Sequence, residues 1–474
     1  MGGEIIMKKE KEESFMRVEK HIIKENHILY KQLDEYCFNS KNLYNYANYH
    51  IRQIFILTSK LFKNEELSKE QQEYLNEINL KVNEFNELKK INFKKARLKA
   101  LKNNKEFKKK LLELKYFSKD NKYPCYDFIE FLVKDGCDYR MMMSQASQQC
   151  LKLLDKNWIS FFESVKKWNK NKDGYTGRPK LPKYLNKNGR NIVTLTNQNC
   201  KLKDNFVQFP AYFNKYELNT NVNNLQQVRI LPRNKHFVIE VVYKSKEKEL
   251  SNDNGKYISI DIGINNLATI CNNVGVSPIV INGKNLKSIN QWYNKKSSYY
   301  KEIAKRMNNL DYTRRMNKIT MKRNNKIDDC MHKSSKMIVE YAYNLGCNTI
   351  VIGNNKDWKR ESSMSKKVNQ SFVGIPHQKL IKMIQYKALD YGINVILTEE
   401  SYTSGTSFLD QEEPIKKNYN KSRRVYRGLF VSDEGKKINS DVNGAYQILK
   451  KVFPNAYANG IVGVGLHPVV VNCF

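Results

Sequence analysis

The stretch YISIDIGINNLAT, residues 257–269, decides how the second half of this 474-residue chain folds. Its opening residues are almost all apolar, as in a strand inside a sheet. A carboxylate within such a strand is costly unless it is paired or binds a metal ion. Asp261 is that carboxylate, and Gly263 follows two residues later. The stretch therefore predicts a core strand that carries a functional acid.

The elements that follow this strand have an informative order. Apolar runs at 257–262, 267–271 and 278–281 lie close together, which predicts three antiparallel strands. We then expect helical sequence from about 286 with a stop at Gly346, a strand at 349–352, a helix beginning at Pro376, a strand at 394–397 and a helix from about 441. The order β-β-β-α-β-α-β-α is that of a ribonuclease-H-like fold.

Two further carboxylates stand at the ends of these elements. Glu400 closes the strand in INVILTEE, and Asp441 opens the last helix in KINSDVNGAYQIL. If the first strand is central, its neighbours bring Asp261, Glu400 and Asp441 to one cleft. Three hard oxygen ligands suit two Mg²⁺ ions, which activate water and stabilise the leaving oxygen in phosphodiester cleavage. Each acid alone could be an ordinary surface carboxylate, and Asp441 could equally be a helix N-cap.

The first half of the chain is organised differently. We expect a strand at 17–24, a helix at 40–55, a charge-dense helical hairpin over 60–122 and a helix over 141–168. A Gly/Pro-rich basic loop at 172–187 precedes strand-like runs between 192 and 243, and 250–255 reads as a linker. These runs predict a small β-rich unit, interpreted as a barrel.

Composition points to a polyphosphate partner. Lys and Arg number 83 against 48 Asp and Glu, which gives a net charge of +35. Such a balance is typical of nucleic-acid binders, although A/T-rich codon usage also inflates Lys and Asn. The 29 Tyr and 21 Phe exclude wholesale disorder. No signal-peptide core is present, and Pro454 and Pro468 make the uncharged C-terminal stretch a poor membrane span, so we expect an intracellular protein.

Several of these stretches resemble a known family. The runs DIGINNLAT (261–269), IVIGNNKDWK (350–359), EESYTSGTS (399–407) and DVNGAYQIL (441–449) are similar to the RuvC-type segments of the TnpB proteins of insertion sequences. The Fanzor nucleases and compact type V CRISPR effectors share these segments. The resemblance extends upstream to 40–53, 144–158 and 177–184. It implies an RNA-guided DNA endonuclease whose one RuvC site, with two Mg²⁺ ions, cuts both strands of its target.

The resemblance also implies a multidomain α/β architecture and its partners. A wedge domain would occupy 1–39 and 171–250, with a β-barrel in the second part, and a helical recognition lobe would occupy 40–170. The RuvC-like nuclease domain, with a helical insertion, would span 256–474. The expected partners are a guide RNA and double-stranded target DNA, with no membrane and no small-molecule substrate. A bacterial host would place the protein in the cytoplasm at the nucleoid, and a eukaryotic host in the nucleus.

The chain departs from the family pattern at two places. The usual second acid lies at the end of the strand at 349–352, where this chain has Gly353-Asn354-Asn355. A subset of the family uses a glutamate on the next strand, and Glu400 fits that arrangement, since strand alternation points Glu399 away. The family's four-cysteine zinc ribbon is also missing, because 401–440 has no cysteine. We therefore expect a degenerate target-nucleic-acid-binding region there, without zinc.

Other candidate nucleic-acid contacts come from the resemblance and from basic clusters. Gln148 and Thr196 fall near positions that contact the flanking target motif in TnpB proteins. Both are also explained as a helix-face glutamine and a strand threonine. The basic candidates are Arg178, Lys180, Arg314, Arg315, Arg423, Arg424 and Arg427.

Two other functions remain open at this point. A nuclease-dead, RNA-guided DNA-binding repressor is compatible with Asn355 in place of an acid. A transposase that joins DNA ends on the same fold would need no guide RNA. Intact Asp261, Glu400 and Asp441 favour the nuclease over the repressor, and the long first half of the chain favours it over the transposase.

Overall fold

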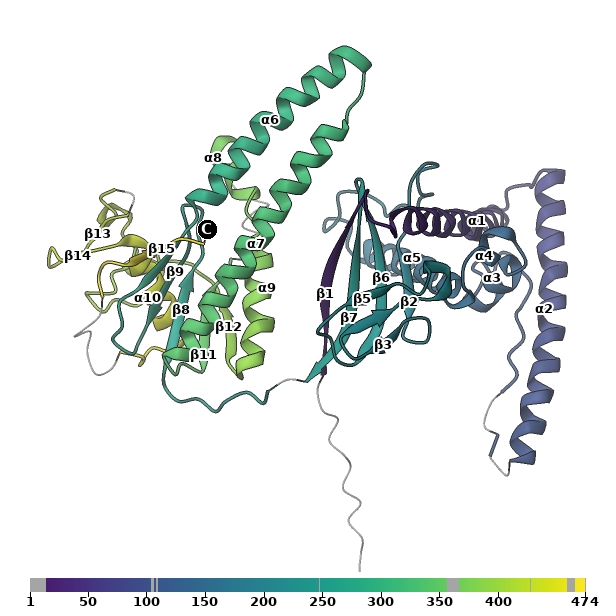
Figure 1. Cartoon of the computed structure of the whole chain (residues 1–474), viewed down its shortest axis with the longest axis horizontal. Helices are drawn as coiled ribbons and strands as arrows, with labels where there is room; N and C mark the ends of the chain where they lie inside the picture. The colour runs from purple at the N-terminus through teal and green to yellow at the C-terminus, as the bar shows by residue number, and fades with distance from the viewer. Residues whose placement is uncertain are drawn as a thin grey trace, which may run out of the picture. The chain divides into compact units, whose positions relative to one another are not determined.

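The chain forms two compact units, Ser14–Ser245 and Lys246–Phe474 (Figure 1). The computed structural model describes residues 14–103, 106–107, 110–246, 248–355, 366–426, 428–457 and 465–473. Within these residues no helix is both long and apolar enough to cross a bilayer. Each unit has its own sheet and its own core, so each is considered separately.

The unit Ser14–Ser245 contains two antiparallel sheets, one of four strands in the order β1-β7-β6-β2 and one of three, β3-β4-β5. The strands are β1 (Ser14–Lys24), β2 (Val193–Thr196), β3 (Lys201–Lys203), β4 (Phe206–Gln208), β5 (Glu217–Asn219), β6 (Leu225–Arg233) and β7 (His236–Lys246). The strands β6 and β7 form a hairpin, with Arg233 paired to His236. The sequence did not predict β3 and β5, because each has only one apolar residue, whereas the equally short β4 has two.

Five helices complete this unit: α1 (Tyr30–Phe62), α2 (Lys69–Lys102), α3 (Tyr126–Val133), α4 (Cys137–Arg140) and α5 (Ser144–Lys170). The expected start of the first helix at residue 40 is wrong, since α1 begins at Tyr30. The residues before 40 continue the same apolar stripe, because Leu33, Tyr36 and Cys37 are buried.

The predicted helical hairpin over 60–122 is wrong. The structure has a single long helix there, α2, and the described chain from residue 110 to 125 is not helical. Two asparagines of α2 hold this returning chain by paired bonds to its backbone. Asn86 bonds Leu114 N and O at 2.8 and 2.9 Å, and Asn79 bonds Phe117 N and O at 2.8 and 3.2 Å. These side-chain hydrogen bonds hold the returning chain against α2 without a second helix.

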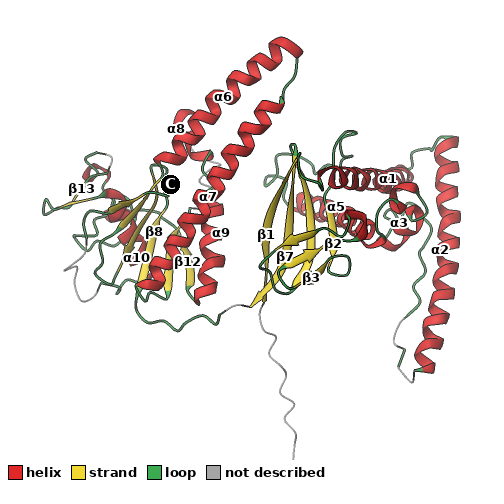
Figure 2. Ribbon diagram, in the orientation of Figure 1, coloured by secondary structure: helices red, strands yellow, loops and turns green. Residues whose placement is uncertain are grey.

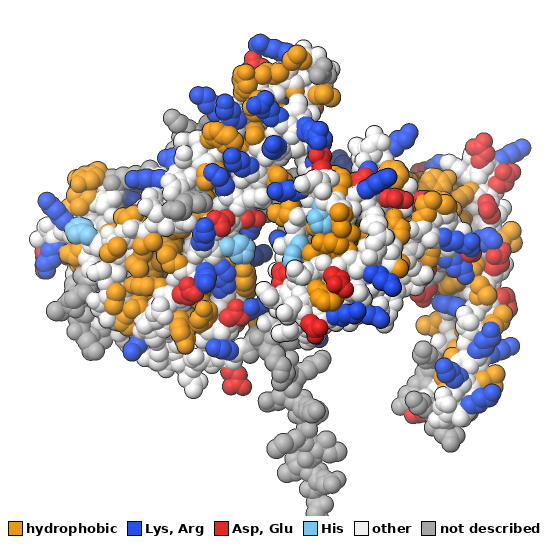
Figure 3. Space-filling view, viewed as in Figure 1, with side chains coloured by type: hydrophobic (Ala, Val, Ile, Leu, Met, Phe, Trp, Pro, Cys, Tyr) orange, Lys and Arg blue, Asp and Glu red, His pale blue; other side chains and the backbone are white. Residues whose placement is uncertain are grey.

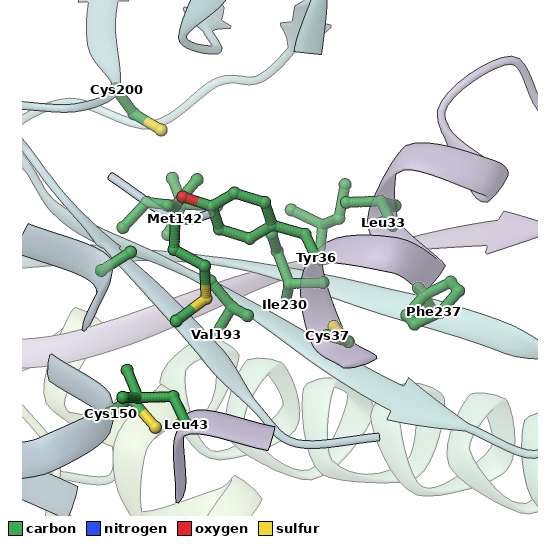
Figure 4. Packing of buried hydrophobic residues seen from close by; sticks show 14 of the residues in the cluster. Leu33, Tyr36, Cys37, Leu43, Met142, Cys150, Val193, Cys200, Ile230 and Phe237 are labelled. Carbon is green, nitrogen blue, oxygen red and sulfur yellow. The ribbon is translucent and has the colours of Figure 1, made fainter. Parts of the chain in front are cut away.

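One hydrophobic core joins α1, α3, α4 and α5 to the sheets of this unit, whereas α2 packs in a separate cluster with α1 and α3. Tyr36 of α1, Met142 between α4 and α5, and Val193 and Ile230 of the four-stranded sheet belong to it (Figure 4). Tyr36 also receives a hydrogen bond at its hydroxyl from Met143 N, at 2.8 Å. The helices and the β-rich part are therefore packed as one body.

The unit Lys246–Phe474 is built on a six-stranded sheet in the order β12-β11-β8-β9-β10-β15. The strands are β8 (Tyr257–Asp261), β9 (Asn266–Asn272), β10 (Ile279–Asn282), β11 (Thr349–Gly353), β12 (Asn394–Thr398) and β15 (Val469–Val471), with a separate pair β13 (Phe430–Val431) and β14 (Lys437–Ile438). The antiparallel β8-β9-β10 meander is confirmed, and β11 and β12 run parallel to β8. β15 was not predicted; it adds to β10 in parallel.

The helices of this unit are α6 (Lys284–Asn308), α7 (Arg314–Asn344), α8 (Lys366–Val373), α9 (His377–Ala388) and α10 (Ser440–Val452). Strand alternation separates two faces of the sheet. Ile258 and Ile260 of β8 pack in one core with α7 and α9, whereas Tyr257 packs with α10 (Figure 2). The β-β-β-α-β-α-β-α order is confirmed, and β8 lies inside the sheet with its carboxyl end beside that of β11.

Candidate active site

Asp261 lies at the carboxyl end of the interior strand β8. The four residues before it in β8 are buried, whereas Asp261 is only partly buried. On the α10 side the packing is close: a Cβ placed on Gly444 would lie 3.1 Å from Asp261 Oδ2. Ser259 Oγ donates to Ala445 O at 2.6 Å and fixes the helix on the strand. The carboxylate therefore lies in a narrow space between β8 and the first turns of α10.

Glu400 reaches this space from β12, across the end of β11. The two strands β12 and β8 are not neighbours, since β11 lies between them. The Glu400 side chain can pass over the end of β11 because the last residue of that strand is a glycine. A Cβ on Gly353 would lie 2.5 Å from Glu400 Oε1 and 2.6 Å from its Cγ. Sequence reasoning missed this role of Gly353, although a glycine at the end of a core strand was a visible signal.

Asn355 holds the Glu400 side chain and backbone together. Its Nδ2 donates to Glu400 Oε2 at 3.2 Å, and its Oδ1 accepts from Glu400 N at 3.0 Å. The other carboxylate oxygen, Oε1, is buried without a hydrogen-bond partner among the described residues. Burial raises the pKa of Glu400 to about 7. The neighbouring Glu399 is exposed and accepts from Ser401 Oγ, as strand alternation predicts.

Asp441 lies in the first turn of α10 but does not cap it. The N-cap is Asn439, whose Oδ1 accepts from Asp441 N at 3.0 Å and from Val442 N at 3.2 Å. The alternative reading of Asp441 as the N-cap is therefore wrong, because an asparagine two residues earlier already satisfies these amides. The Asp441 carboxylate instead accepts from Asn266 Nδ2 at 2.7 Å and from Arg424 Nη2 at 3.2 Å.

The other two acids affect the pKa of Asp261. Desolvation raises the pKa of Asp261 well above its usual range, and the charges of Glu400 and Asp441 raise it further, while Arg424 opposes them. Among the described residues, no three His, Cys, Asp or Glu side chains are arranged to hold one metal ion. Asn266, Arg424 and Asn355 hold the carboxylates instead.

This donor set fits a divalent cation chemically. A bound Mg²⁺ would reduce the repulsion between the carboxylate charges. It would also give the unpartnered Glu400 Oε1 a ligand bond. The guanidinium of Arg424 supplies the only positive charge that lowers the pKa of Asp261 in the described structure. Asp261, Glu400 and Asp441 are the residues that would hold metal.

The other predicted residues lie away from these acids or are held by protein groups. Gln148 on α5 donates to Glu130 at 2.9 Å, and Thr196 at the end of β2 bonds Gln145. Both belong to the unit Ser14–Ser245. Gln148 and Thr196 are thus both bonded to protein groups, and their contact with a DNA motif stays a prediction.

The basic candidates differ in how they are paired. Arg178 and Lys180 are exposed in the loop after α5, and Arg314 and Arg315 are exposed at the start of α7. Arg423 pairs with Glu412 at 2.7 Å and Asp433 at 2.5 Å. Arg424 reaches Asp441, and Arg427 lies outside the described residues.

Comparison with known proteins identifies relatives over much of this unit. Residues 240–359 match the model of the OrfB_IS605 family, described as a probable transposase, and residues 377–448 match the Cas12f1-like TNB domain. Asp261 falls in the first match, and Glu400 and Asp441 in the second. The TnpB-like protein ORF457 of Acidianus two-tailed virus is 26% identical over 203 residues, 41% of this chain. The match spans less than half of that relative, 42% of its length.

Two solved structures are similar at low identity. One is a cryo-EM structure of a Cas12f1–sgRNA–target DNA complex, at 12% identity and a TM-score of 0.32, covering 91% of this chain and 98% of that one. The other is a cryo-EM structure of a CRISPR-Cas12f ternary complex, also at 12% and 0.32, covering 88% and 80%.

Proposed function

Because the chain belongs to the TnpB/Cas12 family, we propose that it is an RNA-guided DNA endonuclease. It binds a guide RNA encoded by its element, recognises a short flanking DNA motif and cleaves double-stranded target DNA. One observation carries the nuclease part of this proposal. Asp261, Glu400 and Asp441 come from three different elements, and the charges of the second and third raise the pKa of the first. Such crowding of partly buried acids is typical of a catalytic site.

The proposal assigns a task to each part of the chain. Residues 256–474 form the ribonuclease-H-like, RuvC-type nuclease domain, which the strand order supports. The match to the TNB domain supports a target-nucleic-acid-binding region at 401–440 that folds without a zinc ribbon. In the first half, 40–170 is the recognition lobe, and 1–39 with 171–250 is the wedge domain with its barrel.

The residues of the site divide the chemistry between them. Two Mg²⁺ ions would supply the Lewis acid that activates water and stabilises the leaving 3′ oxygen. Asp261 on β8, Asp441 on α10 and Glu400 would hold these ions, and Asn355 orients Glu400 so that its Oε1 has no hydrogen-bond partner among the described residues. Arg424, at the same edge, is the side chain that we expect to contact the phosphate of the cleaved strand.

The first experiment is to sequence the RNA that co-purifies with the protein expressed from its native locus. A discrete species that ends in non-coding sequence beside the gene supports the guided function and supplies the guide. With that RNA and Mg²⁺, the wild-type protein should cleave a matched plasmid. Asp261→Ala should abolish cleavage and leave RNA and target binding unchanged.

Other outcomes would identify the competing functions. Binding of guide and target without cleavage by the wild-type protein would show a nuclease-dead repressor. Heterogeneous or absent RNA, together with joining of DNA ends, would show a transposase. Loss of RNA binding in Asp261→Ala would mean that the residue is structural.

A further inference from the structure

A cavity of about 380 Å³ opens between α6 and α7, apart from the carboxylates. We call it the α6–α7 pocket. Its lining residues are Ser288, Ile289 and Trp292 of α6 and Lys322, Arg323 and Lys326 of α7. The space-filling view shows Lys and Arg side chains gathered with hydrophobic ones over this helical hairpin (Figure 3). The pocket thus combines an aromatic ring with positive charge.

Arg323 gives the pocket a fixed positive charge. Its Nε donates to Asn290 Oδ1 at 2.8 Å and its Nη2 to Gly374 O at 2.9 Å. Both acceptors are neutral, so the guanidinium is held in place without being neutralised. A preorganised charge of this kind binds a phosphate with little loss of side-chain entropy.

The lysines beside it are free to bind an anion. None of the six lining residues is acidic, and no described carboxylate forms an ion pair with Lys322 or Lys326. The acids that follow on α7 form ion pairs with other lysines, Asp328 with Lys379 and Asp329 with Lys333. Burial lowers the pKa of Arg323, and Asp328 also lies close enough for its charge to oppose that shift. The positive charge of the pocket is therefore available to a phosphate backbone.

Trp292 supplies the surface on which a base can stack. Its side chain is 43% exposed although it is a large apolar group on a folded helix. An indole beside unpaired cations is the combination that binds single-stranded nucleic acid, because every base has a π-face and every nucleotide a phosphate. An aliphatic ligand would make no use of the three cations.

The pocket is lined in part by α6, the helix whose start contacts the loop after Asp261. The loop after Asp261 is bonded to the start of α6, since Gly283 N donates to Asn265 O at 2.7 Å. Trp292 lies eight residues after Lys284, the first residue of α6. Eight helical residues rise about 12 Å, the length of three or four stacked nucleotides.

We propose that the α6–α7 pocket binds one unpaired nucleotide of a bound strand, with its base on Trp292 and its phosphates on Lys322, Arg323 and Lys326. This inference rests on the proposed function, because it places the nucleotide a few positions from the cleaved bond. Target DNA and guide RNA offer the same base and phosphate chemistry. The experiment must therefore distinguish them.

The test uses the full-length protein freed of co-purified nucleic acid, with fluorescein-labelled dT15 and rU15 as probes. Trp292→Ala should weaken binding by about fivefold or more, whereas Trp292→Phe should keep most of the affinity. Lys322→Ala/Lys326→Ala should lower the slope of log affinity against log salt by about 1.4, that is about 0.7 for each lost phosphate contact. Lys333→Ala/Lys336→Ala is the matched control on the same helix, because both lysines have ion-pair partners.

Each outcome decides the proposal. Loss of dT15 binding identifies DNA as the ligand, and loss of rU15 binding identifies RNA. Unchanged affinity for both probes in Trp292→Ala, equal weakening in Trp292→Phe, or an equal slope change in the control pair would overturn it. Guided cleavage by the wild-type protein is scored separately. If cleavage is absent while Trp292→Ala still loses binding, the proposed function fails and the pocket stands.

Discussion

The carboxylate site and the α6–α7 pocket belong to the same unit but hold charge in opposite ways. In the first, burial and neighbouring acids raise the pKa of Asp261, and burial raises that of Glu400. In the second, the cations are exposed or bonded to neutral groups. Solvated positive charge costs a fold little, whereas crowded buried acids oppose folding. The crowded acids are therefore stronger evidence of function than the cations alone. The basic pocket is comparable evidence only because Trp292 lies beside its cations.

The largest expected effect comes from removing one acid from the crowded site. Glu400→Gln keeps the size of the side chain and the bond to Asn355 but removes a metal-binding charge. We expect the cleavage rate to fall about 10³-fold. Glu399→Gln is the matched control, since Glu399 is exposed, and its rate should stay within about twofold. Cleavage assays with the guide complex measure both. Equal rates for Glu400→Gln and wild type would exclude Glu400 from the site.

A second change obstructs the site without altering its charge. Gly353→Ala places a Cβ where Glu400 Oε1 and Cγ now lie, within 2.6 Å. Displacement of Glu400 by about 1 Å should lower cleavage about 10²-fold. The crowding should also lower the free energy of unfolding by about 1–3 kcal/mol.

Gly177→Ala is the control for this crowding, because no atom lies within 4 Å of its added Cβ. Denaturant melts and cleavage assays should show little change in that variant. Wild-type cleavage by Gly353→Ala would mean that Glu400 does not need to cross the end of β11.

A third prediction concerns the stability of the metal-free protein against pH. The pKa of Glu400 is raised to about 7 in the folded state, above its value of about 4.3 in an unfolded chain. The folded state therefore binds this proton more tightly. Its contribution to stability is fully present below about pH 4.3 and is lost as the pH rises through 7. The loss should be on the order of 1–3 kcal/mol, with Asp261 acting in the same direction.

Urea midpoints measured in EDTA between pH 4 and 8 check this pH dependence. Glu400→Gln should flatten the decline, and Glu399→Gln should keep it. If the stability of the wild-type protein and of Glu400→Gln declines in parallel as the pH rises, groups other than Glu400 cause the pH dependence.

The last prediction compares a cation in a partly buried ion pair with a cation in an exposed one. Arg423 bonds Glu412 and Asp433, and its side chain is only 14% exposed. Arg423→Ala should lower the free energy of unfolding by about 1–3 kcal/mol, because Glu412 loses its partner in a partly buried place. Lys436→Ala, which breaks an exposed pair with Glu434, should leave the free energy of unfolding nearly unchanged. Thermal melts measure both. No loss in Arg423→Ala would leave phosphate binding as the role of this arginine.

Much of the fold of the unit Lys246–Phe474 was predictable from local patterns. Strand and helix periodicity gave the β-β-β-α-β-α-β-α order, and an acid in an apolar strand singled out Asp261. Local patterns did not predict the structure where contacts between distant residues decide the path of the chain. The chain that returns along α2 is held by Asn79 and Asn86, and β15 exists because β10 offers it a free edge. Neither contact leaves a periodic trace in the sequence.

The sequence by itself determined which residues are chemically unusual, because a charge in an apolar run or a +35 balance is visible without coordinates. Only the tertiary structure decided how these residues are used. Glu400 reaches the site because Gly353 has no side chain and Asn355 holds the carboxylate. The Asp441 carboxylate is held by Asn266, which lies on β9. Trp292 becomes a binding surface only when α6 and α7 pack side by side. The physical reason is distance: these partners are far apart along the chain and meet only when the sheet and helices assemble.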